Sequence, residues 1–298
     1  MLILLAIVVD GLVYSSWLFI VALGLTLIFG VMKILNVAHG GLYAVGAYTA
    51  ASMVGVYFDR GLPALGSYGV LLASAVAVGV VVGLLLERGL LRFFYDRDEV
   101  IIVLVTYAVF LMLEDIIRLV WGTNPYFAEQ PYALLGNTHA ARLSFSNYEL
   151  SLIGLALAAG AALWWALNRT RWGALLRVVI HDRELAQAMG IDVARMFTLT
   201  FVAGSILGAL GGAFTAPMIS VTFGIGVEVI VLAFAVVVIG GMGSVPGATL
   251  GALITGMSRS AAVHLMPQLE LFVIYAVMSL VLAFRPQGLF VRAAARRI

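Results

Sequence analysis

Few side chains in this 298-residue sequence are of a type that could do chemistry. No nucleophile, base and orienting group occur together at a recognisable spacing, and the absence of cysteine excludes thiolate metal sites. The only lysine, Lys33, follows Met32, whereas a phosphate-binding P-loop needs a glycine there. The sequence therefore predicts a protein that is not an enzyme, holds no metal and has no P-loop of its own. The histidines are scattered: His39, His139, His181 and His264.

The elements that must position these residues are apolar. Hydrophobic residues make up 63% of the chain and charged residues 11%, and the mean hydropathy is +1.10. This balance excludes a soluble globular domain and predicts an integral membrane protein. Asp10 interrupts the first apolar run and no basic segment precedes it, so we expect no cleaved signal peptide.

Nine apolar stretches are bounded by charge, glycine or proline and have the length of membrane helices. We expect an all-α polytopic bundle of about eight to nine spans, some of them broken, that forms a single transmembrane domain over residues 1–298. The stretches lie at about 12–32, 41–57, 67–86, 100–121, 149–167, 196–215, 227–242, 247–264 and 270–284.

Basic residues beside the spans predict the orientation, because loops rich in lysine and arginine are retained in the cytoplasm. With the N-terminus outside and the C-terminus in the cytoplasm, thirteen basic residues lie inside and two, Arg60 and Arg142, lie outside. The larger loops are then an outer one at 122–148 and an inner one at 168–195. The inner residues are Lys33, Arg88, Arg92, Arg97, Arg169, Arg171, Arg177, Arg183, Arg195, Arg285, Arg292, Arg296 and Arg297.

The segment KILNVAHGGLY, residues 33–43, separates the first two stretches. Asn36, His39, Gly40 and Gly41 break a helix and bring polar groups into the break. In lipid, such a break is tolerated where its backbone is buried in protein or lines a wet cavity. This favours a pathway or gate position at the inner end of the pathway, or packing against another span. The alternative is that Asn36 and His39 cap the helix that follows.

A second joint is glycine-rich and covers IGGMGSVPGATLGALITG, residues 239–256. Small residues at every fourth position permit close helix approach, and Pro246 is suited to begin a helix. The same spacing recurs at Gly204, Gly208 and Gly212. Tight packing within one subunit is the simpler interpretation, and a subunit interface or gate is the other. The candidate pathway or gate residues here are Gly240, Gly241, Gly243, Ser244 and Pro246.

The inner loop contains a second informative segment. Every residue from Asp182 to Met189 is a fair or good helix former, and Gly190 is placed as a C-terminal stop. Polar residues recur beside it at helical spacing: Arg177, His181 and Glu184. A short helix at the cytoplasmic surface is therefore predicted.

Two roles for this short helix remain open. It either anchors the loop at the membrane surface or docks on a partner protein through an apolar patch of Leu185, Ala186 and Met189. The candidate residues for a coupling helix are His181, Asp182, Arg183, Glu184, Leu185, Ala186, Met189, Gly190 and Asp192.

Charged residues inside the spans need a partner or water, because an ionised group in hydrocarbon is unfavourable. Glu114 and Arg118 are four positions apart, so the simplest interpretation is that they pair on one helix face, and a coupling-ion site is the alternative. The intramembrane charges are Glu114, Asp115, Arg118 and Arg259.

Five motifs, in this order, resemble the permease subunit of branched-chain amino acid ABC transporters, the shorter of their two permease types. The resemblance runs nearly end to end, with one departure at Gly41, where relatives often carry glutamate. The motifs are GLTLIFGVMKILNVAHGGLYAVGAY (24–48), LVTYAVFLMLEDIIRLVWGTNP (104–125), HDRELAQAMGIDVARMFTLTFVAGSILGALGGAF (181–214), VVIGGMGSVPGATLGALI (237–254) and RPQGLF (285–290).

The resemblance implies a multi-pass protein of the bacterial inner membrane that forms the translocation pathway of an ATP-driven importer. Its solutes would be branched-chain or other amino acids or related small polar molecules. The implied partners are two cytoplasmic ATPase subunits that hold ATP and Mg, a second permease subunit in a heterodimer or homodimer, and a periplasmic solute-binding protein. The chain itself would contact membrane lipid, bind no cofactor and bind no nucleic acid.

A different functional class stays open as the alternative, namely an ion-coupled secondary carrier or a passive channel for small solutes. A carrier needs ionisable groups at mid-membrane and has no use for a docking helix. The middle thirds of the predicted spans hold almost no ionisable residues, and the inner loop predicts such a helix. These two features favour the importer.

Overall fold

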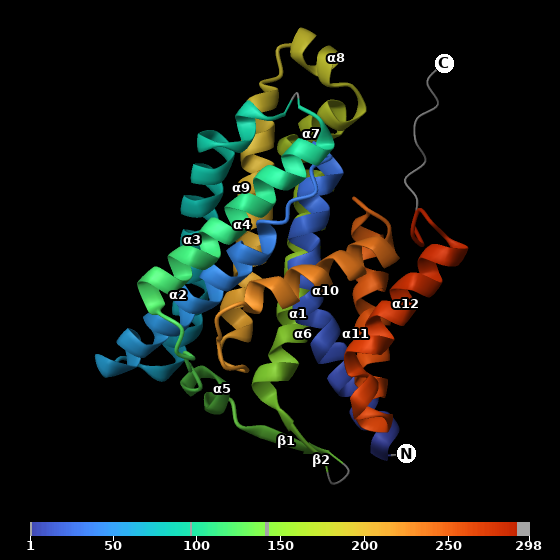
Figure 1. The fold of residues 1–298 in the computed structure, drawn as a ribbon. Helices are drawn as coiled ribbons and strands as arrows, with labels where there is room; N and C mark the ends of the chain where they lie inside the picture. Colours follow the sequence, from blue (N-terminus) through green and yellow to red (C-terminus); the bar gives the residue numbers. More distant parts are fainter. Residues whose placement is uncertain (1, 96, 141–142, 291–298) are drawn as a thin grey trace.

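The computed structural model describes residues 2–95, 97–140 and 143–290 (Figure 1). Within them, each of the nine predicted stretches corresponds to one long helix, and the first helix begins at Leu2, ten residues before its predicted start at about residue 12. They are α1 (Leu2–Met32), α2 (His39–Asp59), α3 (Ser67–Gly89), α4 (Glu99–Trp121), α6 (Asn147–Arg169), α9 (Val193–Thr215), α10 (Ile225–Gly240), α11 (Val245–Leu265) and α12 (Glu270–Phe284). The short elements are η1 (Ala64–Gly66), η2 (Leu91–Phe93), α5 (Gln130–Leu134), β1 (Asn137–Ala140), β2 (Leu143–Ser146), α7 (Arg171–His181), α8 (Arg183–Ala188) and η3 (Pro267–Leu269).

Seven described segments are long and apolar enough to cross a membrane by themselves. The helices α10 and α11 pass the same test only as a pair, which is bent by 117° at its break and raises the number of candidate spans to eight. With 16 residues, α10 is about 24 Å long, shorter than a hydrocarbon core of about 30 Å. The prediction of an all-α membrane bundle with broken helices is confirmed.

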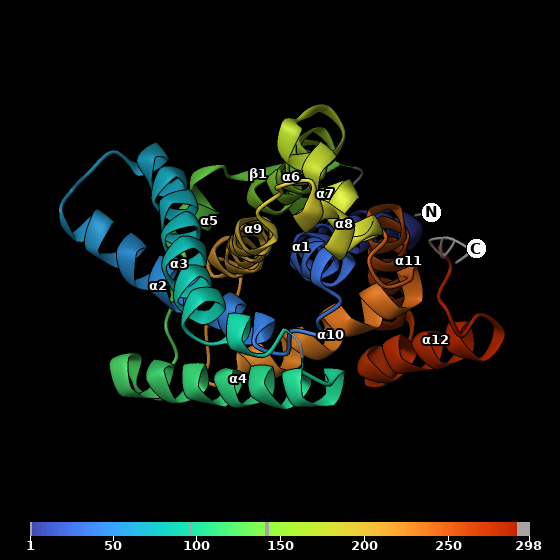
Figure 2. The same ribbon diagram turned by 90° about the horizontal axis from the view of Figure 1, so that it is seen from above.

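The helices α1 and α9 lie at the centre of the bundle, and α4 and α12 lie at its edge (Figure 2). Three clusters of buried apolar side chains hold the bundle together, and each includes residues of α1: Ile20 in the first, Leu23 in the second and Val21 in the third. Because α1 takes part in all three clusters, its stretch from Leu18 to Met32 is fixed against the other helices of the core, whereas its first residues are exposed.

Side-chain caps determine where several helices begin. The Asp98 carboxylate accepts the Val100 N–H at 2.9 Å at the start of α4, and the Asp192 carboxylate accepts the Arg195 N–H at 3.0 Å at the start of α9. The first N–H groups of a helix have no partner inside it, so these bonds stabilise the first turn. Both caps stand directly before an apolar run, at the residue where the helix begins.

The two large loops lie at opposite ends of the bundle (Figure 1). The predicted inner loop supplies α7 and α8 at one end, and the predicted outer loop supplies α5 and the antiparallel hairpin of β1 and β2 at the other end, near the start of α1. The hairpin was not predicted. Four basic residues of the orientation argument lie outside the described residues: Arg142, Arg292, Arg296 and Arg297. Which end faces the cytoplasm stays a prediction.

Single cysteines test that orientation cleanly, because the chain has none of its own. Thr138 and Asp192 are both exposed and lie in the two opposite loops. We expect an impermeant maleimide added to sealed right-side-out vesicles to label Thr138→Cys, and to label Asp192→Cys only after the membrane is permeabilised. Labelling of Asp192→Cys alone in sealed vesicles would reverse the orientation.

Candidate functional site

The break between α1 and α2 covers residues 33–38 and is held by α4. Lys33 has a φ of 59°, and the chain then runs without helical bonds until His39 begins α2. The Thr106 hydroxyl of α4 accepts the Val37 N–H at 3.2 Å. Its single proton is shared between the Leu35 carbonyl oxygen at 3.2 Å and the Val103 carbonyl oxygen of α4 at 3.0 Å. One side chain therefore satisfies the Val37 N–H, which the broken helix leaves open, and lies within hydrogen-bond distance of the Leu35 carbonyl oxygen.

His39 places the start of α2 deep inside the bundle. Its ring is fully buried, and Nε2–H donates to the Val21 carbonyl oxygen of α1 at 2.9 Å. A Cβ on Gly24 of α1 or on Gly208 of α9 would lie 2.8 Å from the His39 Cε1 atom, so these two glycines make room for the imidazole. Val21 and Gly24 lie 8 to 11 residues before the end of α1, or about 12–16 Å along it. After the end of α1, the chain of the break therefore folds back into the bundle, so that His39 lies beside the middle of α1.

Asn36 is buried without any hydrogen bond from its side chain. Neither its amide oxygen nor its amide nitrogen has a partner within the described part of the chain, and the same holds for His39 Nδ1. The residue before α2 is Ala38, and no side chain of residues 2–95, 97–140 or 143–290 caps this helix. The interpretation that Asn36 and His39 cap α2 is therefore wrong, and a buried amide without a partner is one that needs water or a ligand.

The two glycines of the break contact different helices. A Cβ on Gly40 would lie 2.7 Å from Ile230 Cβ of α10, and a Cβ on Gly41 would lie 2.8 Å from Leu113 Cδ1 of α4. A larger side chain at position 41 would require the Leu113 side chain to shift. The break is therefore enclosed by α1, α4, α9 and α10.

The second joint lies between α10 and α11, as predicted. Ser244 caps α11 by accepting the Gly247 N–H at 3.1 Å, with Pro246 in the first turn. Gly241 and Gly243 have φ angles of 100° and 79°, which strongly favour glycine. A Cβ on Gly243 would lie 2.9 Å from the Gly30 Cα atom, near the end of α1. Both joints therefore lie beside the same half of α1.

The C-terminal motif RPQGLF is bound to this joint. The Leu289 N–H donates to the Ile239 carbonyl oxygen at 3.0 Å, and the Phe290 N–H donates to the Gly240 carbonyl oxygen at 2.9 Å. These carbonyl groups belong to the last turn of α10, where no helical partner is left for them. The motif was one of the five that carried the resemblance, but its contact with the joint was not predicted.

The predicted surface helix is present as α8, but it is separate from α7. Asp182 is extended, with φ −151° and ψ 111°, and caps α8 by accepting the Leu185 N–H at 2.9 Å. The polar residues Arg177 and His181 thus belong to α7 and do not continue the face of Glu184, as the spacing had suggested. Gly190 ends α8 with a φ of 79°, and the Ile191 N–H bonds to the Ala186 carbonyl oxygen at 3.0 Å.

The two faces of α8 differ in exposure. Leu185 and Met189 are 51% and 56% exposed, whereas Ala186 is 0% exposed and belongs to a buried apolar cluster. Ala186 therefore cannot be part of a docking patch, because it fixes α8 to the bundle. Asp192 also lies outside α8, since it caps α9. The exposed apolar part of the predicted patch is Leu185 and Met189.

The small residues of α9 pack inside the chain. Gly204 faces α1, Gly208 faces His39, and a Cβ on Gly212 would collide with the Tyr43 carbonyl oxygen of α2. This agrees with the simpler interpretation of the spacing, tight packing within one subunit.

Gly212→Val is expected to lower the free energy of unfolding by at least about 1–3 kcal/mol, because the side chain would push against backbone. Gly154→Val in α6 is the control, since nothing lies within 4 Å of a Cβ there. Thermal unfolding of both variants in the same detergent measures the difference. Equal stability of the two would contradict the close α2–α9 contact.

The sequence as a whole matches one family model. The model of the branched-chain amino acid transport system / permease component matches residues 7–282. The chain belongs to this family. It is therefore a transport subunit and not an enzyme, and it is a multi-pass protein of the bacterial inner membrane.

Named relatives of this permease cover almost its full length. The high-affinity branched-chain amino acid transport system permease protein LivH of Escherichia coli K12 is 25% identical over 97% of this chain and 96% of its own. BraD of Pseudomonas aeruginosa, which carries the same description, is 26% identical over 97% and 96%. Among solved structures, PsaBC from Streptococcus pneumoniae in complex with Fab matches with a TM-score of 0.46 and 11% identity, over 93% of this chain and 91% of that one.

The intramembrane charges of the permease are arranged differently from the prediction. Glu114 is 6% exposed; one carboxylate oxygen accepts the Gly224 N–H at 3.2 Å, and the other has no partner among the residues described. Arg118 and Asp115 are exposed. No ion pair joins Glu114 to Arg118 in the described ranges, so that predicted pair is wrong.

Arg259 has two partners that the sequence analysis missed. Its guanidinium pairs with Glu270 at the start of α12 and lies over the Tyr14 ring of α1, 4.0 Å from the centroid. Glu270 follows Arg259 by eleven residues, across the turn between α11 and α12, and this proximity in sequence was the available signal. Over residues 2–95, 97–140 and 143–290, no three His, Asp or Glu side chains come together as a metal site.

Proposed function

We propose that this permease forms the translocation pathway of an ATP-driven importer for branched-chain amino acids or related small polar solutes, and that cytoplasmic ATPase subunits drive it through α8. The observation that carries the coupling is α8 itself, a helix capped at both ends whose exposed face offers Leu185 and Met189. The chain has no P-loop, so the energy of ATP has to enter from a partner.

The proposed assembly contains two ATPase subunits, this permease with a second permease subunit, and a periplasmic binding protein. The family supports this set of partners, because a permease component is one part of a transport system. We propose that α8 seats in a groove of one ATPase subunit, where apolar burial gives about 25 cal/mol per Å².

The proposed gate is the break at residues 33–41 together with the joint at 240–246. Three features support it: the break enters the bundle, Asn36 and His39 carry polar atoms with no partner among the described residues, and both joints lie beside the same half of α1. A pathway needs polar atoms free to meet solute or water, and backbone joints that can change shape.

A second candidate is a cation-coupled carrier, and one observation favours it. The Glu114 carboxylate is buried and keeps one oxygen without a partner in the described chain. Such a group is suited to a small cation. A cation-coupled carrier gives no role to the exposed apolar residues of α8, and we therefore place this candidate second.

Purified complex in proteoliposomes tests the proposed function. We expect leucine, isoleucine or valine, presented with the binding protein, to stimulate ATP hydrolysis, and fructose and guanosine to have no effect. Stimulation by none of the amino acids in the panel would overturn the proposed solute class. Failure of the ATPases to co-purify with the permease would overturn the proposed coupling.

A further inference from the structure

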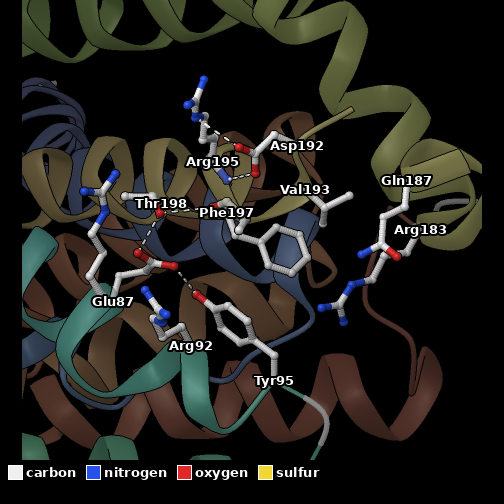
Figure 3. A pocket seen from close by; sticks show the side chains of 12 residues that line it. Glu87, Arg92, Tyr95, Arg183, Gln187, Asp192, Val193, Arg195, Phe197 and Thr198 are labelled. Atoms are coloured by element: carbon white, nitrogen blue, oxygen red, sulfur yellow. Dashed lines mark hydrogen bonds and ion pairs between the residues drawn. The ribbon is translucent and has the colours of Figure 1, made fainter. Parts of the chain in front are cut away.

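A cleft of about 440 Å³ opens beside α8 (Figure 3). One wall is made by the end of α3, by η2 and by Tyr95 after it, and the other by α8 and the start of α9. Half of the lining residues are charged, and four of them are arginines: Arg88, Arg92, Arg183 and Arg195. The proposed docking of α8 through Leu185 and Met189 does not explain why four arginines line this cleft.

The floor of the cleft is a buried carboxylate whose two oxygens are both occupied. Glu87 is 1% exposed, and it accepts the Tyr95 hydroxyl and the Thr198 hydroxyl, each at 2.7 Å (Figure 3). Burial and the hydrogen bond to Glu87 raise the pKa of Tyr95, which stays protonated and donates. These bonds join α3, the following turn and α9 into one rigid unit.

The wall formed by α8 is joined to this floor through aromatic rings. The Arg183 guanidinium lies over the Phe197 ring at 5.1 Å from the centroid, and Phe197 meets the Tyr95 ring edge-on at 5.2 Å. Contacts of this kind contribute about 0.5–1.5 kcal/mol each. The position of α8 therefore sets the width of the cleft.

Within the described part of the chain, two arginines at the mouth have no acidic partner. Arg88 and Arg92 are exposed, and among the described residues neither forms an ion pair; Arg92 only lies over the Phe93 ring at 5.2 Å. Arg195, by contrast, is paired with Asp192 at 3.0 Å. The Glu87 carboxylate at the floor repels an incoming anion. The anion therefore stays at the mouth of the cleft, within reach of Arg88 and Arg92.

We propose that Arg88 and Arg92 form a second contact with the ATPase and receive carboxylate side chains from its surface. This inference rests on the proposed function, because a partner seated on Leu185 and Met189 also covers the mouth, whose wall includes Arg183 and Gln187 of α8. An anionic lipid carries the same charge. The ATPase is favoured because one of the two walls is formed by α8 and the first residues of α9. These residues lie at the end of the bundle and not along the side of a membrane-spanning helix (Figure 1).

The test uses Arg88→Gln with Arg92→Gln, and Arg97→Gln as the matched control. Arg97 is exposed and follows in the same turn, but it does not line the cleft. Permease in nanodiscs of phosphatidylcholine is titrated with the ATPase at low and high salt. We expect the double variant to bind about tenfold more weakly at low salt, and the difference to shrink at high salt because exposed charges are screened. Arg97→Gln should bind like the wild type.

Two results overturn the inference. One is equal affinity of the double variant and the wild type, and the other is a loss that occurs only when phosphatidylglycerol is present, which assigns the cleft to lipid. Leu185→Glu with Met189→Glu is titrated in parallel. If that variant loses binding and the arginine variant does not, only the second contact fails; if neither loses binding, the proposed function fails at α8.

Discussion

Leu185→Glu combined with Met189→Glu is expected to reduce solute-stimulated ATP hydrolysis at least about 30-fold. The two side chains are the exposed apolar part of α8, and the change places two carboxylates in a contact that loses its water. The fold of the permease should not change, because Ala186 still fixes α8 to the bundle. The measurement is ATP hydrolysis in proteoliposomes, with and without solute.

Leu185→Met combined with Met189→Leu is the matched control, since it exchanges the same two positions and keeps them apolar. This variant should hydrolyse ATP at a rate close to the wild type. Normal stimulation in the glutamate variant, at equal amounts of permease in the membrane, would reduce α8 to an anchor for its loop.

Asn36→Leu is expected to make the permease more stable and less active. A buried amide without a hydrogen bond lowers stability by about 1–3 kcal/mol, and leucine removes it. Solute uptake should nevertheless fall at least about tenfold, because the break would lose the polar atoms that meet solute or water. Uptake and thermal unfolding are measured on the same preparation, and co-purification with the ATPases should be unchanged.

Asn168→Leu makes the same exchange at an exposed position near the end of α6 and should leave uptake intact. His39→Leu should reduce uptake as Asn36→Leu does, since it removes His39 Nδ1, a second buried polar atom that lacks a partner among the described residues. Wild-type uptake by both Asn36→Leu and His39→Leu would mean that the break serves packing alone.

The parts of this structure that depend on neighbouring residues could be predicted from the sequence. Continuous apolar runs predicted the nine long helices. Local turn chemistry predicted Gly190 as the end of α8 and Pro246 near the start of α11, because a left-handed residue and a helix start are both set within a few positions.

The contacts that depend on distant residues could not be predicted. The Thr106 hydroxyl accepts the Val37 N–H of the break from 69 positions further along the chain. The Leu289 N–H donates to the Ile239 carbonyl oxygen, although α11 and α12 lie between the two residues in sequence. The direction of Ala186 was equally hidden, because periodicity does not say which side of a six-residue helix faces the bundle. Helical spacing predicted one polar face from Arg177 to Glu184, but the extended backbone of Asp182 interrupts it.

The measurement that tests the central claim most directly is uptake of radiolabelled leucine by proteoliposomes that contain the permease pair and its ATPases, with binding protein outside. Our account predicts uptake only when ATP is enclosed, at a rate that ionophores do not change. Uptake driven by an imposed ion gradient in the absence of ATP would contradict it and would identify a secondary carrier, with Glu114 as its first candidate site.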